Sequence, residues 1–263
     1  MTRVAAVAFV LTAAAAGAQE AAIDADRPHV GTGTHVVPVG QVQFELGGQL
    51  QQFGTRHSSA APVLMRVGVS GRVEARLASD GVIVESAGGT SSSQLADPQA
   101  SAKIRLFGGG DEPWLSVMPA FTFGPGDATV TLLAGAALTE RAHLEANYGI
   151  GSLGGDGDRF VQHLVTAAVT HATTRALTTY VEGAWWSRQH PLAGAVSFVD
   201  FGAIYAVAPR VLVDGGALVG LTTDTADYGL FAGVSFVVGT PHHERRGSHR
   251  TATSAFRAAP DRD

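Results

Sequence analysis

The stretch VSFVDFGAIYAVAPRVLVDGGALVGLTTDTADYGLFAGVSFVV, residues 196–238, decides the fold. It reads as three strands joined by turns at Ala208–Arg210 and Thr222–Asp227. In each strand every second residue is apolar, whereas the positions between them mix Asp, Gly, Ser and apolar residues. A period of two places successive side chains on opposite faces and therefore indicates strands. Runs of about ten residues suit tilted transmembrane strands, so this stretch predicts part of an all-β, antiparallel, up-and-down transmembrane barrel.

Composition agrees with one large β domain. The chain has 263 residues, including 33 Gly and no Cys, with 45% hydrophobic and 16% charged residues and a mean hydropathy of +0.15. No apolar run of about 18 residues follows the N-terminus, so no helical membrane span is expected. The lack of Cys excludes disulfides and thiolate metal sites.

The N-terminus has the pattern of a secretory signal peptide. Arg3 precedes an apolar run from Val4 to Ala16, and Ala16-Gly17-Ala18 forms an A-x-A cleavage site. We therefore expect residues 1–18 to be removed and the protein to lie in the Gram-negative envelope, in the bacterial outer membrane. Without Arg3 the chain carries 17 basic and 23 acidic residues, a formal charge of 17 − 23 = −6. This balance argues against a nucleic-acid partner.

Alternation and turn signals predict about twelve barrel strands between residues 41 and 238. Short connections alternate with longer ones such as Gly54–Pro62 and Asp80–Pro98. Outer-membrane barrels have short turns at one rim and longer loops at the other, whereas a sandwich has no reason to alternate. An extended segment, 19–40, is expected before the barrel, either in the periplasm or as a plug. A polar tail, 239–263, is expected after it. The strands before residue 196 are predicted at Gln41–Phe53, Val63–Val69, Arg72–Ser79, Gln99–Phe107, Trp114–Phe123, Ala128–Leu138, Ala142–Ile150, Phe160–His171 and Leu177–Ser187.

The residues IDADRPHVGTGTHVVPVGQVQFELG, 23–47, carry a family resemblance. They resemble the mature N-terminus of the outer-membrane transporter family of the "meta-pathway of phenol degradation". The resemblance implies a barrel of about twelve strands and a role in the uptake of small, often aromatic, molecules. The chain departs from the family after Gly239, where a polar tail replaces an aromatic end. The matching motif residues are Asp26, Arg27, Pro28, Pro38 and Gly40, with Thr32, Thr34, Gln43 and Glu45 between and after them.

Charged residues on the predicted strands occupy the positions opposite the apolar face. Arg or Lys facing lipid at mid-depth costs about 2–4 kcal/mol, so these side chains are expected to face the lumen and line the path of a solute. The basic residues of strands two to four would face the acidic residues of strands seven to eleven. This predicts either a transverse field that orients solutes or salt bridges that fill the barrel. The candidate lumen-lining residues are Glu45, Arg66, Arg72, Glu74, Arg76, Lys103, Arg105, His143, Glu145, Glu182, Asp200 and Asp214.

The sequence thus predicts a porin-like channel or transporter for small, possibly aromatic or hydrophobic solutes, and not an enzyme. Its expected partners are outer-membrane lipid, the barrel-assembly machinery and an unidentified small solute. No pattern predicts a cofactor, and the histidines in the tail, His242, His243 and His249, are too loosely held to predict a metal site. Two alternatives remain open: a periplasmic or secreted β-sandwich that binds a ligand, and a barrel-embedded lipid hydrolase.

Overall fold

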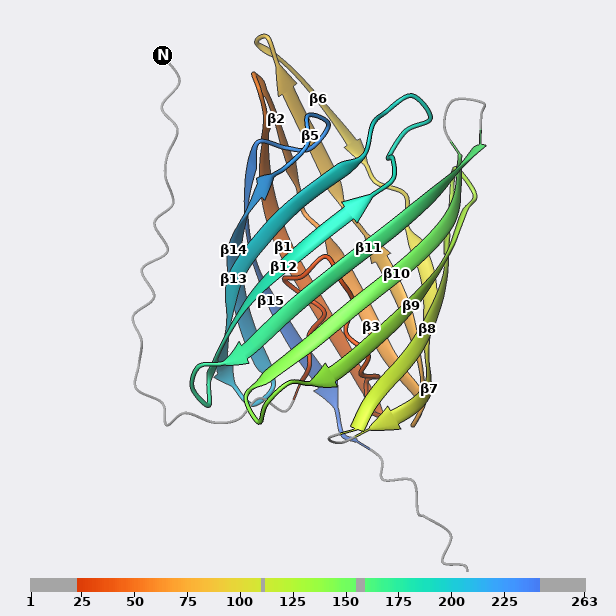
Figure 1. Ribbon diagram of the computed structural model, residues 1–263, viewed down its shortest axis with the longest axis vertical. Coiled ribbons are helices and arrows are strands. Elements are labelled where there is room, and N and C mark those ends of the chain that lie inside the picture. Colours follow the sequence, from red (N-terminus) through yellow and green to blue (C-terminus); the bar gives the residue numbers. More distant parts are fainter. Residues whose placement is uncertain (1–22, 110–111, 155–158, 242–263) are drawn as a thin grey trace, which may run out of the picture.

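The computed structural model describes residues 23–109, 112–154 and 159–241, which form a closed antiparallel barrel (Figure 1). Twelve of its fifteen strands build the wall, in chain order. The last strand pairs with the first from Gln41↔Gly239 to Gln52↔Tyr228, which closes the barrel and removes its edges. The predicted fold class is confirmed. The wall strands are β1 (Gln41–Phe53), β3 (Val63–Ser70), β4 (Val73–Ser79), β7 (Gln99–Gly109), β8 (Glu112–Thr122), β9 (Asp127–Ala137), β10 (Ala142–Gly154), β11 (Arg159–Ala172), β12 (Leu177–Trp186), β13 (Val196–Ala208), β14 (Val211–Gly220) and β15 (Tyr228–Gly239).

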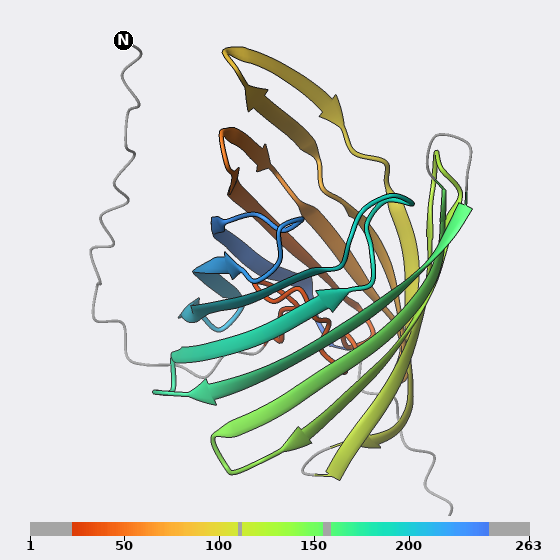
Figure 2. The same cartoon turned by 45° about the horizontal axis from the view of Figure 1, so that its top comes forward.

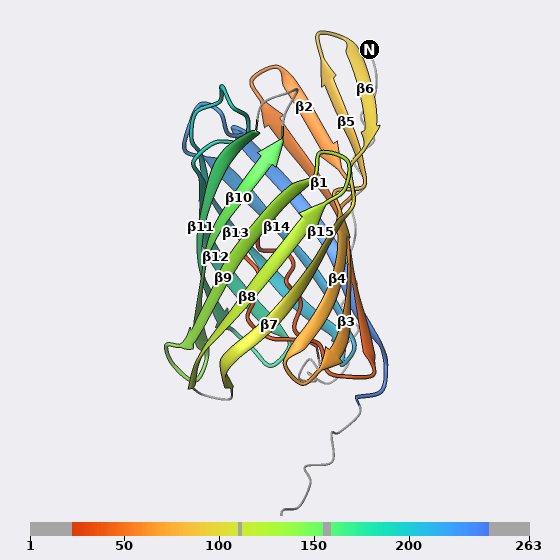
Figure 3. The same cartoon turned by 90° about the vertical axis from the view of Figure 1, so that its right-hand side faces the viewer.

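Three short strands extend one side of the wall beyond the barrel (Figure 3). They are β2 (Arg56–Ala60), β5 (Val82–Ala87) and β6 (Thr90–Leu95), and they pair in the order β1–β2–β5–β6. The expectation that Gly54–Pro62 and Asp80–Pro98 are loops was therefore wrong. Every residue of β6, TSSSQL, is exposed, so water reaches both of its faces and no alternation of polar and apolar residues is required.

Adjacent residues of the wall face opposite environments, as the alternation predicts. On β12 the Val181 residue is 49% exposed, whereas its neighbour Glu182 is 1% exposed. Outward positions such as Phe201, Leu230 and Val238 are exposed and apolar, which suits contact with hydrocarbon. The same parity points the charged side chains of β1, β3, β4, β7 and β12–β14 toward the lumen.

The two rims differ in the length of their connections. Short turns join β3 to β4, β9 to β10, β11 to β12 and β13 to β14 at one rim, where β1 also begins and β15 ends. The other rim carries the β2–β5–β6 extension and the connection 187–195 between β12 and β13. In outer-membrane barrels the short-turn rim is periplasmic and the other is extracellular, and the rims are named accordingly here. The described residues contain no helix long and apolar enough to cross a membrane.

The described part of the predicted N-terminal segment, residues 23–40, enters the barrel rather than staying outside it (Figures 1 and 2). Its end is placed against the wall by a parallel bridge between Val39 and Gly68 and by a hydrogen bond of 3.1 Å from Gln41 N to Pro38 O. Gly40, with φ of 83°, reverses the chain from the lumen into β1, a conformation that favours glycine. A side chain at Gly68 would clash with the carbonyls of Val37 and Pro38. The predicted signal peptide and the part of the predicted tail beyond residue 241 lie outside the described residues.

Candidate functional site

The candidate site is the contact between residues 24–38, called the lumen segment below, and the charged side chains of the wall. The segment has no regular secondary structure and folds back on itself, so that Asp24 lies beside His35. Asp26 contacts side chains of β3, β4 and β7, whereas Arg27 contacts β14. These two adjacent residues connect the basic and the acidic sides of the lumen.

Asp26 lies in a buried cluster of six charges, three of each sign. Its carboxylate pairs with Arg76, with Lys103 at 3.3 Å and with Arg66 at 3.5 Å. Glu45 and Glu74 complete the cluster, at 3.1 Å and 3.0 Å from the Arg66 guanidinium. Every member is at most 9% exposed. Because removal from water is costly for each charge, the cluster is stable only while all its members are paired.

Arg27 lies against the opposite side of the barrel. Its guanidinium donates to Asp214 through Nη2 at 3.1 Å and Nε at 3.3 Å, and the Asp214 side chain is 2% exposed. The guanidinium lies over Gly47 of β1 and Gly233 of β15, which are partners across the seam that closes the barrel. A Cβ at either position would clash with the guanidinium. The paired glycines therefore form the cradle that admits Arg27.

Wall carboxylates also bind the backbone of the lumen segment. Glu182 accepts hydrogen bonds from Val30 N at 2.7 Å and Gly31 N at 2.8 Å. Glu74 accepts from Val37 N at 2.7 Å, and Glu45 accepts from Arg27 N at 2.9 Å. A segment without a neighbouring strand has free amides, and bonds to carboxylates satisfy them strongly.

Neutral side chains complete the binding of the segment. Asn147 donates to Thr32 O at 3.1 Å, and Ser116 donates to Thr34 O at 3.0 Å. A Cβ at Gly31 would lie 2.6 Å from Glu182 Oε1, so a larger residue here would have to push the end of this side chain aside. The Gly-Thr-Gly-Thr run is therefore shaped to fit the wall.

Two pairs of rings hold the segment on its periplasmic side. His35 packs edge-on against Trp114 with centroids 4.3 Å apart, and His29 packs edge-on against Tyr180 at 4.4 Å. Trp114 lies over Gly135 of β9, where a Cβ would clash with its ring nitrogen. His35 Nδ1 also lies 2.8 Å from Asp24 Oδ2, and this contact raises the pKa of His35 above its ordinary value of 6.5.

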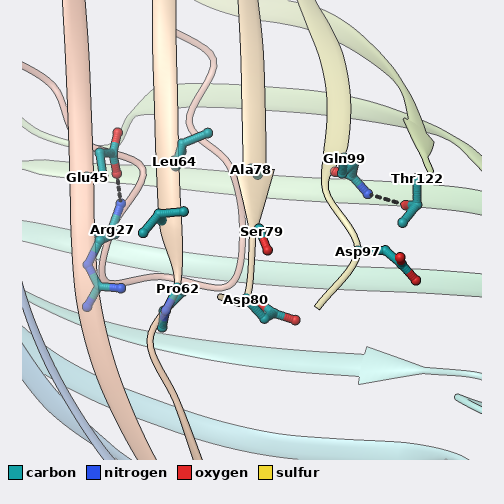
Figure 4. A pocket seen from close by; sticks show the side chains of 11 residues that line it. Arg27, Glu45, Pro62, Leu64, Ala78, Ser79, Asp80, Asp97, Gln99 and Thr122 are labelled. Carbon is teal, nitrogen blue, oxygen red and sulfur yellow. Dashed lines mark hydrogen bonds between the residues drawn. The ribbon is translucent and has the colours of Figure 1, made fainter. Parts of the chain in front are cut away.

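Cavities lie on both sides of the lumen segment. On the extracellular side, a cavity of about 300 Å³ runs from Arg27 and Glu45 at one end to Asp97, Gln99 and Thr122 at the other (Figure 4). A second, of about 260 Å³, lies between Val30–Thr32 of the segment and strands β7–β11. On the periplasmic side, a cavity of about 530 Å³ is lined by His35, Trp114, Glu145 and Arg175, among others. Residues of the segment therefore line cavities toward both rims of the barrel.

The structure brings most of the predicted lumen-lining residues into this arrangement. His143 and Glu145 line the periplasmic cavity, and Tyr180 donates to Asp200 at 3.2 Å beneath the segment. Arg72 was predicted on a strand inside the barrel, which is wrong: β4 begins at Val73, and Arg72 is exposed in the turn before it. Arg105 also lies at the periplasmic rim, where its guanidinium donates to Gly71 O. The other candidates are buried on the lumen side of the wall, and their role as a solute path stays a prediction: Glu45, Arg66, Glu74, Arg76, Lys103, Glu182, Asp200 and Asp214.

The motif residues Asp26, Arg27, Pro28, Pro38 and Gly40 all belong to the segment and its return to the wall. The sequence did not predict which wall residues they contact, nor the role of Gly47, Gly135 and Gly233. A glycine on a predicted strand indicates that another group approaches the backbone closely. The approaching side chains, Arg27 and Trp114, could not be predicted, because they lie far from these glycines in the chain.

Similarity to solved structures agrees with the barrel. An outer-membrane channel from Pseudomonas putida F1 matches with a TM-score of 0.61 and 11% identity, over 80% of this chain and 100% of that one. The NanC porin matches with a TM-score of 0.54 and 13% identity, over 73% and 98%. The KdgM porin matches with a TM-score of 0.51 and 9% identity, over 74% and 98%. At these identities the likeness concerns the fold.

No curated protein sequence matches the chain significantly. The model of one protein family, described as "Putative MetA-pathway of phenol degradation", matches residues 25–237. The match begins inside the lumen segment and ends in β15, so it includes both the barrel and the site. The resemblance expected from the motif is confirmed, and the chain belongs to this family.

Proposed function

We propose that the lumen segment is the gate of this channel and that solutes pass when it leaves its contacts with the wall. The observation that carries the proposal is the position of the segment between the extracellular and the periplasmic cavities. A solute that moves from one side to the other must displace residues 24–38 or pass around them. The lumenal charges accordingly hold the gate, and the six charges of the buried cluster, three of each sign, neutralise one another.

The transported solutes are small and largely apolar or aromatic. The family description, which refers to phenol degradation, supports this class. Cavities of about 260–300 Å³ on the extracellular side have room for a single-ring molecule. The Trp114 and His35 rings supply aromatic surface on the periplasmic side.

The protein acts by transport and not by catalysis, without a cofactor or metal. The similar solved structures, which are channels and porins, support this role. The signal-peptide pattern of residues 1–18 and the barrel fold support an outer-membrane location. Such a location implies contact with outer-membrane lipid and insertion by the barrel-assembly machinery.

A disulfide that locks the gate tests the proposal. The chain has no Cys, so a designed pair forms without competition. Thr166 Oγ1 of β11 lies 2.7 Å from the position of a Cβ at Gly31, which suits a disulfide between Gly31→Cys and Thr166→Cys. In planar bilayers the oxidised protein should stay closed, and reduction should restore current. Small aromatic solutes should then block this current at lower concentrations than sugars of similar size.

Each single Cys variant is the matched control, because it carries the same change in volume without the cross-link. Equal currents before and after reduction, with the disulfide verified by mass, would contradict a gating role for the segment. Equal block by aromatic solutes and by sugars would contradict the solute class alone.

A further inference from the structure

Five arginines lie around the periplasmic rim. Arg72 belongs to the β3–β4 turn, Arg141 to the β9–β10 turn, Arg175 to the β11–β12 turn and Arg210 to the β13–β14 turn. Arg105, near the end of β7, donates to Gly71 O and so lies at the same level. These five, called the rim arginines below, place a guanidinium at four of the short turns and one beside them.

The rim arginines have no carboxylate partner within 4.0 Å among residues 23–109, 112–154 and 159–241. Arg72, Arg141, Arg175 and Arg210 are exposed, and Arg105 is half-buried. The extracellular rim differs, because Arg56 lies 3.6 Å from Glu85 and Arg159 lies 3.9 Å from Asp127. It also carries Asp80, Asp97, Asp224 and Asp227, which gives that rim an excess of acidic residues.

One rim arginine reaches the mouth of the barrel, and the others lie in the turns around it. Arg175 lines the periplasmic cavity of about 530 Å³ together with Trp114 and His35. Arg141 lies in the turn before β10, and Arg210, in the turn before β14, donates through Nη2 to Gly239 O at 2.6 Å, where β15 ends at the same rim. Three carboxylates lie at this rim: Asp24, which pairs with His35, Glu145, which lines the cavity, and the exposed Glu140 beside Arg141. Among the side chains that the structure describes, the five rim arginines outnumber these three carboxylates.

We infer that the rim arginines form an anion-collecting ring that gathers small organic anions, above all carboxylates, at the periplasmic mouth. This rests on the proposed function and adds a charge preference at one end of the path. Charges of one sign around a low-dielectric opening focus the field and raise the local concentration of counter-ions. Guanidinium groups also bind carboxylates through two parallel hydrogen bonds. The opposite excess at the extracellular rim makes the channel electrically asymmetric along its axis.

Quenching of Trp114 fluorescence tests the ring without requiring an open channel. Trp114 lines the same cavity as Arg175, and Trp185→Phe with Trp186→Phe leaves it as the sole tryptophan. In a neutral detergent at low salt, iodide should quench Trp114 more strongly than caesium. Arg141→Gln with Arg175→Gln and Arg210→Gln should lower iodide quenching about threefold and raise caesium quenching. Both changes should vanish near 1 M salt, where the screening length is about 3 Å. Benzoate added at low salt should lower the iodide quenching of Trp114 in the protein with the intact ring but not in the triple variant.

Arg56→Gln with Arg188→Gln at the extracellular rim is the matched control. It should change the quenching of Trp114 by neither iodide nor caesium. Unchanged iodide and caesium quenching in the triple variant, with acrylamide quenching also unchanged, would overturn the inference. The amount of phosphatidylglycerol that stays bound to the purified protein is measured as well. If the triple variant retains less of this lipid but shows unchanged iodide quenching, the inference is overturned, because the ring would then bind lipid headgroups. A channel that conducts but shows no ring effect would refute this inference alone. A ring effect in a protein that never conducts would support the ring and refute the gating proposal.

Discussion

The basic and the acidic sides of the lumen hold the same segment in different ways. On the basic side, Asp26, Glu45 and Glu74 match Arg66, Arg76 and Lys103 in number, and every carboxylate touches a cation. On the acidic side, Asp214 is paired with Arg27, whereas Glu182 and Asp200 have no cation within 4.0 Å in the described part of the chain. Glu182 instead accepts two segment amides, and Asp200 accepts from Tyr180. A matched ionic cluster resists opening more than a set of amide bonds, so the acidic side should release first.

The largest effect should come from Asp26→Asn. This change leaves three buried cations with one carboxylate fewer, at a cost of about 3–5 kcal/mol to the closed state. The ratio of open to closed channel should rise more than 100-fold, since about 1.4 kcal/mol corresponds to a factor of ten. Single-channel recording measures this ratio. Asp24→Asn is the matched control, because Asp24 pairs only with His35 and should change the ratio little. If Asp26→Asn and Asp24→Asn changed the open-to-closed ratio equally, the buried charged cluster would hold the segment no more strongly than the exposed Asp24–His35 pair.

Arg27→Gln should have the next largest effect. It leaves Asp214 buried without its cation, and the loss of two charge-assisted hydrogen bonds should cost about 2–3 kcal/mol. Asp214→Asn should relieve part of this cost, so a double-mutant cycle on the open-to-closed ratio should show coupling between the two residues. Strictly additive effects would indicate that the Arg27–Asp214 pair does not hold the closed segment.

Glu182→Gln should have a smaller effect than either. The side-chain amide oxygen still accepts from Val30 or Gly31, and the change removes one of two neighbouring buried carboxylates. We expect a cost of about 1 kcal/mol, or roughly a fivefold rise in the open-to-closed ratio. A rise as large as that of Asp26→Asn would reverse the order of release proposed for the two sides.

Asn147→Ala should have the smallest effect. It removes one neutral hydrogen bond to Thr32 O, worth about 0.5–1 kcal/mol. Labelling of a Thr32→Cys variant by a thiol reagent would report the release of the lumen segment independently of current. An effect above tenfold in this variant would show that neutral contacts, and not the charged cluster, dominate closure.

Strand parity was predictable for most of the site because burial repeats every two residues. Glu45, Lys103 and Glu182 were placed on the lumen side from their apolar neighbours alone. Arg72 was misplaced because alternation cannot locate the end of a strand, and the chain turns one residue later than expected. The β2, β5 and β6 strands were missed because their backbone pairing extends above the apolar band, where neither face selects apolar side chains.

The sequence by itself determined that the chain forms a barrel, which side chains face the lumen and which family motif precedes the first strand. These properties are local, since each depends on the period of a strand or on residues close together in the chain. Only the tertiary structure decided that Asp26 lies with Arg66, Arg76 and Lys103, and that Arg27 rests on Gly47 and Gly233 beside Asp214. These contacts join residues up to 187 positions apart, and they exist only because closure brings the first and last strands together around the segment.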